Sequence, residues 1–177
     1  MTSVSSSPQT VEFTGAGGIT LVGDEWNRDA PSDRPSILML HGGGQNRFSW
    51  KNTGQILADE GFHVVALDAR GHGDSDWDPN GNYSLEAMSR DLLSIIATLR
   101  SPPALVGASM GGMCSLYSVG NSEAVIASAL VLVDVVPRVG TEGAAKIGSF
   151  MGSRPEGFAT LEEAADAVSA AGCLCLG

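Results

Sequence analysis

Four short apolar segments constrain the fold of this chain more than any other feature of its sequence. They are Ile37–Leu40 (ILML), Phe62–Leu67 (FHVVAL), Ala104–Ala108 (ALVGA) and Ala129–Val133 (ALVLV). Apolar runs of this length are typical of strands that are covered on both faces, as in a parallel sheet. Helical patterns lie between them. This alternation predicts right-handed crossovers and an α/β fold, with a mostly parallel sheet and flanking helices.

The helices can be placed from their spacing and their caps. Residues 50–61 show helical spacing that ends in a glycine, and Ser84 can cap a second helix. Residues 110–119 predict a third helix. Ahead of the first buried run, residues 11–13 and 19–26 predict a two-stranded hairpin around a glycine-rich turn.

The composition argues against several classes of partner. The net charge is −10, and an acidic chain of this kind is not expected to bind nucleic acid or an anionic membrane surface. The first ten residues are polar, and no apolar stretch reaches the roughly 18 residues of a membrane span, so we expect a cytoplasmic protein. The cysteines predict no disulfide framework. The sequence has no phosphate loop, metal-ligand cluster or haem motif, so we expect no cofactor.

The third apolar run leads into Gly107-Ala108-Ser109-Met110-Gly111, which matches the pattern G-x-S-x-G. In a nucleophile elbow of this pattern, the serine occupies a strained turn between a strand and a helix. The residues two positions away on either side press against each other, so they must be small. The turn exposes the hydroxyl, and the helix N-terminus directs its N–H groups at the reacting atom. The pattern predicts that Ser109 is a nucleophile. The alternative is a tight turn with an inert serine.

Three further motifs accompany the elbow. Residues 40–44 (LHGGG) begin at the end of the first buried run, residues 67–75 (LDARGHGDS) begin at the end of the second, and residues 130–137 (LVLVDVVP) overlap the fourth. In this order, the motifs resemble the α/β-hydrolase superfamily, in its branch of serine esterases, haloperoxidase-like enzymes and C–C hydrolases. The resemblance implies the α/β-hydrolase fold without its last strands.

The resemblance also implies a domain organisation. Residues 11–137 correspond to the N-terminal part of the hydrolase core. Residues 138–177 correspond to the start of a helical lid followed by an aberrant C-terminal tail, and residues 1–10 are expected to form a flexible N-terminal tail.

Individual residues take roles from the resemblance. Ser109 matches the nucleophile, and the backbone N–H groups of Gly43 and Met110 match the two donors of the oxyanion hole. A serine at this position argues against epoxide hydrolase or dehalogenase chemistry, because those relatives use a carboxylate nucleophile. His41 and His72 match turn positions that shape the loops around the site.

Two further polar residues are expected to be structural. Asp68 ends a strand and is expected to accept hydrogen bonds from loop amides. His63 lies near the start of a strand and is expected to pack in the sheet. Trp50 and Trp77 either line a pocket or pack against neighbouring side chains, and packing is the favoured expectation.

The chain departs from the family at the catalytic base. In this fold the triad runs serine, acid, histidine, yet His41, His63 and His72 all precede Ser109. Asp134, which follows the fourth apolar run, is the one well-placed acid, although an aspartate there more often binds backbone amides. A single strand follows Ser109, where the family has further strands that carry the acid and the histidine.

We therefore interpret the chain as the N-terminal part of a hydrolase that has lost its C-terminal part. Residues 141–152 and 160–171 predict two weak helices, and the final AAGCLCLG has neither strand nor loop character, as after a frameshift or an alternative end. The strand at residues 129–133 would then form an exposed sheet edge through which the chain could self-associate.

Three functions stay open from the sequence. The first is a serine hydrolase by ancestry, acting on a small ester or related acyl substrate and impaired by the missing histidine. The second is a catalytically dead domain that binds a ligand or a protein. The third is a truncated product without function. A ligand that raises stability without being cleaved would favour the second.

Overall fold

The computed structural model describes residues 7–31, 33–135, 149, 152–154 and 156–170. The chain divides into two compact units, Met1–Val135 and Val136–Gly177. The sheet, its core and the residues of the candidate site all lie in the first unit.

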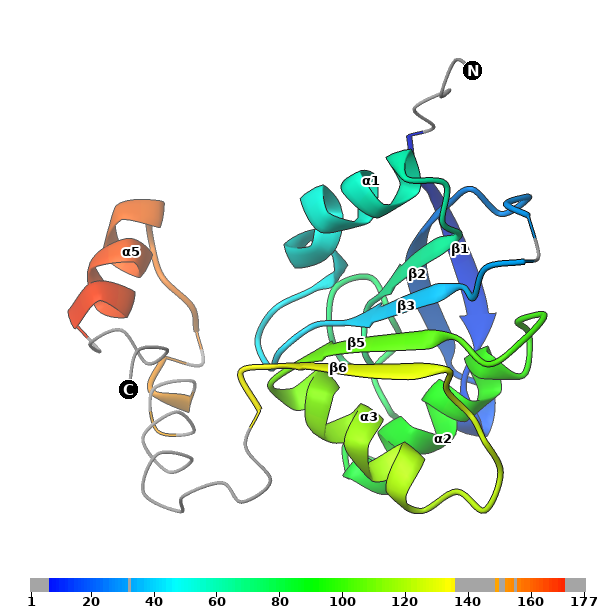
Figure 1. Ribbon diagram of the computed structural model, residues 1–177. Coiled ribbons are helices and arrows are strands. Elements are labelled where there is room, and N and C mark those ends of the chain that lie inside the picture. Colours follow the sequence, from blue (N-terminus) through cyan, green and yellow to red (C-terminus); the bar gives the residue numbers. More distant parts are fainter. Residues whose placement is uncertain (1–6, 32, 136–148, 150–151, 155, 171–177) are drawn as a thin grey trace. The chain divides into compact units, whose positions relative to one another are not determined.

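Six strands form one sheet in the order β1-β2-β4-β3-β5-β6 (Figure 1). They are β1 (Gln9–Thr14), β2 (Thr20–Trp26), β3 (Ile37–Leu40), β4 (Val64–Leu67), β5 (Ala104–Ala108) and β6 (Ala129–Val133). Strand β3 pairs in parallel with β4 and β5, and β5 pairs in parallel with β6. Strands β1 and β2 form the predicted antiparallel hairpin, and β2 pairs antiparallel with β4. The arrangement confirms the predicted α/β fold class.

Helices cover both faces of this sheet. They are η1 (Ala16–Gly18), η2 (Arg47–Trp50), α1 (Lys51–Asp59), α2 (Leu85–Ile96) and α3 (Met110–Gly120). Helix α1 lies on one face, and α2 and α3 lie on the other (Figure 1). The predicted cap of α2 is present, because the Ser84 hydroxyl accepts a hydrogen bond from the Ala87 N–H at 3.2 Å.

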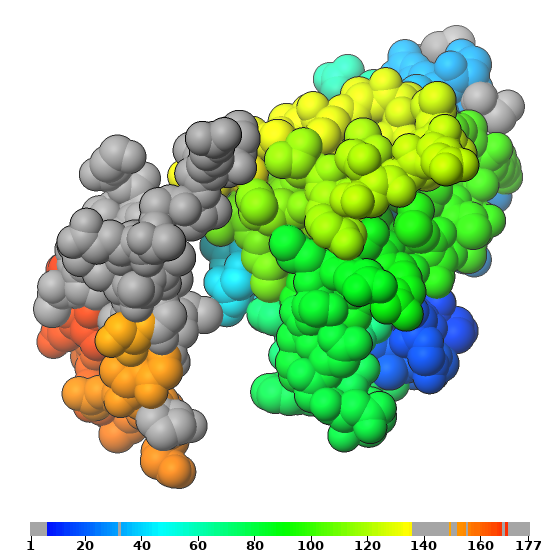
Figure 2. Space-filling view, turned by 90° about the horizontal axis from the view of Figure 1, so that it is seen from below, coloured from blue at the N-terminus to red at the C-terminus, as the bar shows by residue number. Residues whose placement is uncertain are grey.

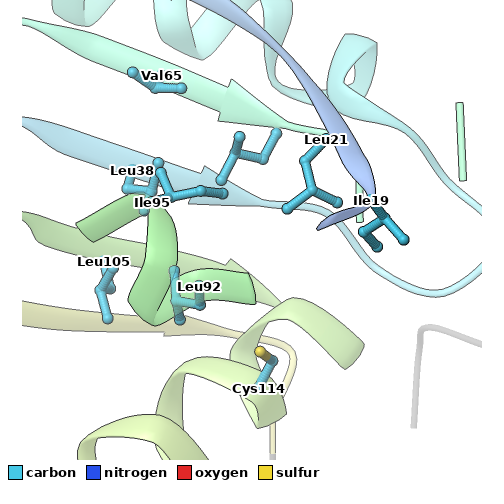
Figure 3. Close-up of a cluster of buried hydrophobic side chains, with 9 residues drawn as sticks. Ile19, Leu21, Leu38, Val65, Leu92, Ile95, Leu105 and Cys114 are labelled. Atoms are coloured by element: carbon cyan, nitrogen blue, oxygen red, sulfur yellow. The ribbon is translucent and has the colours of Figure 1, made fainter. Parts of the chain in front are cut away.

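Successive side chains of the inner strands point into two separate apolar clusters. Leu38 and Leu105 pack with Ile95 in the cluster between the sheet and helices α2 and α3 (Figure 3). Met39 and Trp26 belong to the cluster on the face that α1 covers. All five side chains are at most 2% exposed. Burial of one such side chain contributes about 2 kcal/mol to stability. Uninterrupted apolar runs are therefore required here, because both faces of the sheet are covered.

Strand β6 forms one edge of the sheet. Its apolar residues Val131, Leu132 and Val133 are 47%, 38% and 42% exposed. Figure 2 shows this yellow segment at the surface, next to the lime-green residues of α3. An edge strand with exposed apolar side chains is a template for pairing with another chain.

The first strand begins earlier than the sequence predicts. Gln9 and Thr10 pair with Glu25 and Asp24 of β2. The predicted flexible tail over residues 1–10 is therefore wrong for its last two residues. Both side chains are polar and exposed on an edge strand, so a search for apolar residues does not find them.

The second unit contains helix α5 (Leu161–Ala170), which confirms the helix predicted over residues 160–171. The Thr160 hydroxyl accepts a hydrogen bond from the Glu163 N–H at 3.1 Å, as in a capping box. The helix predicted over residues 141–152 falls almost entirely outside the described residues. Within the described part of the chain, every helix is too short or too polar to cross a membrane.

Candidate active site

Ser109 occupies a strained turn between β5 and α3. Its backbone dihedrals are φ 44° and ψ −109°, and a non-glycine residue held in such a region costs roughly 1–3 kcal/mol. Neighbouring segments hold the turn: the Ser109 N–H donates to the Val133 carbonyl at 3.0 Å, and the Ser109 carbonyl accepts from the Met113 N–H at 2.8 Å. Ser109 itself is exposed. The geometry of the turn is thus the one that the pattern predicts, and its chemical role stays a prediction.

Close backbone contacts explain the two glycines of the pattern. A Cβ atom on Gly107 would lie 2.6 Å from the carbonyl carbon of Gly111. A Cβ atom on Gly111 would lie 2.5 Å from the carbonyl oxygen of Leu40. The Gly111 N–H also donates to the His41 carbonyl at 3.1 Å, which joins the start of α3 to the loop after β3. No larger residue fits at either position without moving the backbone.

The loop after β3 faces the turn. A Cβ atom on Gly42 would lie 3.5 Å from the Cβ of Ser109, and one on Gly43 would lie 3.9 Å from the Sδ of Met110. The side-chain carbonyl of Gln45 holds the loop by accepting from the Gly42 N–H at 2.9 Å. Neither the Gly43 N–H nor the Met110 N–H donates a hydrogen bond among the described residues. Met110 begins α3, where backbone N–H groups have no partner within the helix. The two predicted oxyanion donors therefore lie on neighbouring segments with their N–H groups available.

His41 is buried beneath this loop, and both of its ring nitrogens are occupied. Its Nε2 accepts from the Ala69 N–H at 3.0 Å, so its Nδ1 carries the proton and donates to the Gly42 carbonyl at 2.8 Å. Burial lowers the pKa of His41 below its ordinary value. A neutral imidazole with both nitrogens engaged supports the loop, which agrees with the predicted structural role.

His72 is also engaged in the loops. Its Nδ1 donates to the Arg70 carbonyl at 3.1 Å, and its Nε2 lies 3.4 Å from the Gly44 nitrogen. Its ring stacks at a tilt against His41, with centroids 5.0 Å apart. The third histidine, His63, lies at the amino ends of the parallel strands, directly before β4, whereas Ser109 lies at their carboxyl ends, directly after β5. In the described part of the chain, no histidine is hydrogen-bonded to Ser109.

A buried carboxylate fixes the loops after β3 and β4. Asp68 accepts from the N–H of Arg47 at 2.6 Å and from the N–H of Asp74 at 3.0 Å, and it pairs with the Arg47 guanidinium. Asp24 binds the same guanidinium at 3.0 Å. The Asp74 carboxylate lies 2.7 Å from it as well. Although burial opposes the charge, hydrogen bonds to the three carboxylates raise the pKa of Arg47. The prediction that Asp68 binds loop amides is confirmed. The sequence analysis missed Arg47 and Asp24, because no local pattern marks a contact across 23 residues.

Asp134 directly follows β6 and lies close to Ser109 along the sheet. The last residues of β5 and β6, Ala108 and Val133, are paired in register, so Ser109 and Asp134 leave neighbouring strands side by side. Asp134 is exposed and has a φ of 53°, a conformation that non-glycine residues seldom adopt. Its place is compatible with an acid that orients a histidine, and that role stays a prediction.

The thiol of Cys114 does not offer a nucleophile near Ser109. Cys114 is 3% exposed, and burial raises the pKa of its thiol to about 12. A thiol in this state is unreactive at neutral pH. Among the described residues, no cluster of three or more His, Cys, Asp and Glu side chains could hold a metal ion.

Comparison with known proteins places this geometry in context. Residues 37–172 match the family model described as the alpha/beta hydrolase family. The chain is 31% identical to protein phosphatase methylesterase 1 of Bos taurus over 138 residues, which are 75% of this chain and 36% of that protein. It is 35% identical to an esterase of Mycobacterium tuberculosis over 129 residues, which are 72% of this chain and 40% of that protein. The chain thus spans less than half the length of these relatives.

A solved structure gives the same picture. The crystal structure of an alpha/beta hydrolase from Novosphingobium aromaticivorans superimposes with a TM-score of 0.72 at 25% identity, over 80% of this chain and 49% of that one. The shared region therefore includes most of the residues described above.

Proposed function

Because the chain belongs to the alpha/beta hydrolase family, we propose that it derives from a serine hydrolase in which Ser109 is the nucleophile. The proposed substrate is a small ester or a related acyl compound, and the esterases among the relatives support this class. The observation that carries the proposal is the strained turn, which exposes Ser109 at the start of α3 beside the available N–H groups of Gly43 and Met110.

The proposed reaction is acyl transfer. The Ser109 Oγ attacks the ester carbonyl carbon, and the N–H groups of Gly43 and Met110 hold the resulting oxyanion, each contributing about 3 kcal/mol to the transition state. A base takes up the Ser109 proton, the bond to the leaving alcohol breaks, and the base passes that proton to the alcohol. Water then releases the acyl group from Ser109 as a carboxylic acid.

We propose that residues 1–177 supply no histidine to take the Ser109 proton, so this chain is severely impaired as an enzyme. Both ring nitrogens of His41 and of His72 are already engaged, and His63 lies at the opposite end of the parallel strands from Ser109. Loss of the base from a serine triad lowers turnover by roughly 10⁶ in a well-studied protease. An oxyanion hole and substrate binding alone still give roughly 10³–10⁴ over water. Asp134 would orient a histidine that another chain or segment brings to Ser109.

Chemical rescue tests this proposal. We would follow hydrolysis of a short-chain p-nitrophenyl ester by the 177-residue chain in increasing concentrations of imidazole, beside Ser109→Ala and a matched Ser101→Ala control. Without imidazole, we expect the steady-state rates of all three, measured after any initial release of p-nitrophenol, to be close to background. With imidazole, we expect the chain and its Ser101→Ala variant to exceed Ser109→Ala. Equal rates for all three at every imidazole concentration would contradict a nucleophilic Ser109.

Because no histidine is hydrogen-bonded to Ser109 in the described part of the chain, a second candidate function is ligand binding without catalysis. As a catalytically dead domain, the chain would bind an ester or another acyl compound without cleaving it. A ligand present at 100 times its dissociation constant would then stabilise the fold by about 2.7 kcal/mol. A rise in melting temperature with no product formed would distinguish this function from hydrolysis.

The partners follow from the same features. We propose a small-molecule ligand rather than nucleic acid or membrane, because the chain carries a net charge of −10. We also propose a cytoplasmic location, no cofactor, and self-association through the exposed edge of β6.

A further inference from the structure

A second serine of this chain is hydrogen-bonded to a histidine, far from Ser109. The Ser36 Oγ lies 2.7 Å from the His63 Nδ1, and the His63 Nε2 lies 2.9 Å from the Glu25 Oε1. An ionised carboxylate only accepts, so the Nε2 carries the proton and the Nδ1 accepts from the Ser36 hydroxyl. A hydroxyl, an imidazole and a carboxylate in this sequence form the arrangement that activates a serine. The two ring nitrogens have exchanged their places relative to the serine protease triad.

The three side chains are held on the sheet rather than on mobile loops. Ser36 and His63 directly precede β3 and β4, and Glu25 belongs to β2. The side chains of Glu25 and His63 are 7% and 15% exposed. The second oxygen of Glu25 pairs with the Arg28 Nε at 3.1 Å, which fixes the carboxylate from the other side.

This site is separate from the candidate active site. The Ser36 carbonyl accepts from the N–H of Ala104, which begins β5, whereas Ser109 follows the end of β5. A strand of this length spans about 16 Å. The two serines therefore lie at opposite ends of the parallel strands and cannot act on the same bond.

A cavity gives access to the second site. Its volume is about 550 Å³, and Glu25, Ser36 and His63 all line it. This volume lies within the range of about 300–1,000 Å³ that small-molecule sites occupy. Arg34 and Arg100 line the same cavity, and a positive charge there favours a carbonyl oxygen that gains negative charge.

The backbone beside Ser36 offers no oxyanion hole. The Ile37 N–H donates to the His63 carbonyl at 2.8 Å, and the Ala104 N–H is already bonded to Ser36. Stabilisation of the tetrahedral intermediate is therefore weak at this site. An ester that reacts here must have a good leaving group, such as an aryloxide.

We propose that Ser36 is a second acylation site of this protein, with His63 as its base, and that it reacts with small, activated esters. The Ser36 Oγ forms a bond to the ester carbonyl carbon while its proton moves to the His63 Nδ1. The bond to the aryloxide then breaks, and the aryloxide leaves with that proton or as the free anion. Glu25 is a positioning residue, since it orients the imidazole and stabilises its protonated form.

The experiment uses the full chain with Ser109→Ala in every variant, so its outcome does not depend on the function proposed for Ser109. We would measure the initial release of p-nitrophenol from p-nitrophenyl acetate and locate the acetyl group by mass spectrometry of peptides. We expect the acetyl group on Ser36. We expect Ser36→Ala to abolish the initial release, and His63→Gln to slow it by roughly 100-fold, as for a lost general base. Ser94→Ala is the matched control, because Ser94 lies on α2 outside the lining of this cavity, and it should leave the release unchanged.

The role of Glu25 has its own readout. Glu25→Gln should lower the maximal rate of acylation without changing the ester concentration at which half of that rate is reached. A general loosening of the cavity would change both. The proposal is overturned if the acetyl group is found only on lysines or other residues, or if Ser36→Ala releases p-nitrophenol as fast as its parent. Fluorescence of the buried Trp26 would verify that each variant is folded.

Discussion

Replacement of Gly111 by alanine tests whether close packing at the Ser109 turn limits the stability of the fold. The added Cβ atom would lie 2.5 Å from the Leu40 carbonyl oxygen, 2.6 Å from the Leu40 Cβ and 2.7 Å from the His41 carbonyl oxygen. Two of these atoms belong to the backbone and cannot rotate away. Overpacking of this kind costs up to about 3 kcal/mol. The shift would also break the bond from the Gly111 N–H to the His41 carbonyl, which contributes about 1 kcal/mol.

We therefore expect Gly111→Ala to lower the free energy of unfolding by about 4 kcal/mol. Urea unfolding followed by tryptophan fluorescence measures this, because Trp26 is 1% exposed in the core of the first unit. With a slope of about 2 kcal/mol per molar urea, the midpoint should fall by about 2 M.

Gly120→Ala is the matched control. Gly120 ends the same helix, and a Cβ atom there would meet no atom within 4 Å. Alanine at this position should be neutral or should stabilise by up to about 1 kcal/mol. Equal midpoints for the two variants would refute the reasoning, since the contacts around Gly111 would then place no limit on the turn.

Two further predictions concern the pH dependence of stability caused by the buried His41 and self-association through the edge strand β6. Because burial lowers the pKa of His41, the folded state takes up a proton less readily than the unfolded state. The free energy of unfolding should therefore fall as the pH drops below about 6.5, by at most about 1.4 kcal/mol per pH unit. His41→Gln should remove this slope between pH 7.5 and 5.5, as measured by urea unfolding, whereas an unchanged slope would assign it to other groups. At the edge, Leu132→Lys should lower self-association measured by sedimentation velocity, because a charge on an edge strand opposes pairing. Val125→Lys changes a residue that is 80% exposed but lies before β6, and an equal effect from it would contradict pairing through β6.

The sequence predicts the parts of the fold that depend on local pattern. The uninterrupted apolar runs become strands β3, β4, β5 and β6. In the inner strands, alternate side chains enter apolar clusters on both faces, which explains why these runs lack polar residues. The turn at Ser109 is equally readable, because a Cβ atom on Gly107 would meet Gly111 and Gly112, which lie within five residues of it. Ser84 and Thr160 mark the starts of their helices for the same reason: a cap acts within one turn. The need for glycine at position 111 has a distant cause, since a Cβ atom there would meet Leu40 and His41.

Contacts between distant segments could not be predicted in this way. His63 was expected to pack in the sheet, yet its ring joins Ser36 to Glu25 across 27 and 38 residues of sequence. Only the strand order, with β4 between β2 and β3, brings these three residues together. The expectation that Trp77 packs was wrong, because its side chain is 74% exposed and only one edge-on contact with Tyr83 accompanies it among the described ring contacts. A tryptophan in a loop carries no periodic pattern that distinguishes the two cases.

The hydrogen bonds described at the Ser109 turn come from residues of the first unit, and this separates two parts of the proposed chemistry. Asp68 and Arg47 hold the loops, while the His41 carbonyl and the Val133 carbonyl hold the turn itself. The strain of roughly 1–3 kcal/mol at Ser109 is therefore sustained without any histidine beside its hydroxyl. In the reaction that we propose, the N–H groups of Gly43 and Met110 would polarise a bound carbonyl, whereas removal of the Ser109 proton would need a base. A base added in solution should therefore restore removal of the Ser109 proton, while polarisation of the carbonyl needs no addition. For this reason imidazole, rather than a change of substrate, distinguishes an impaired hydrolase from a binding domain.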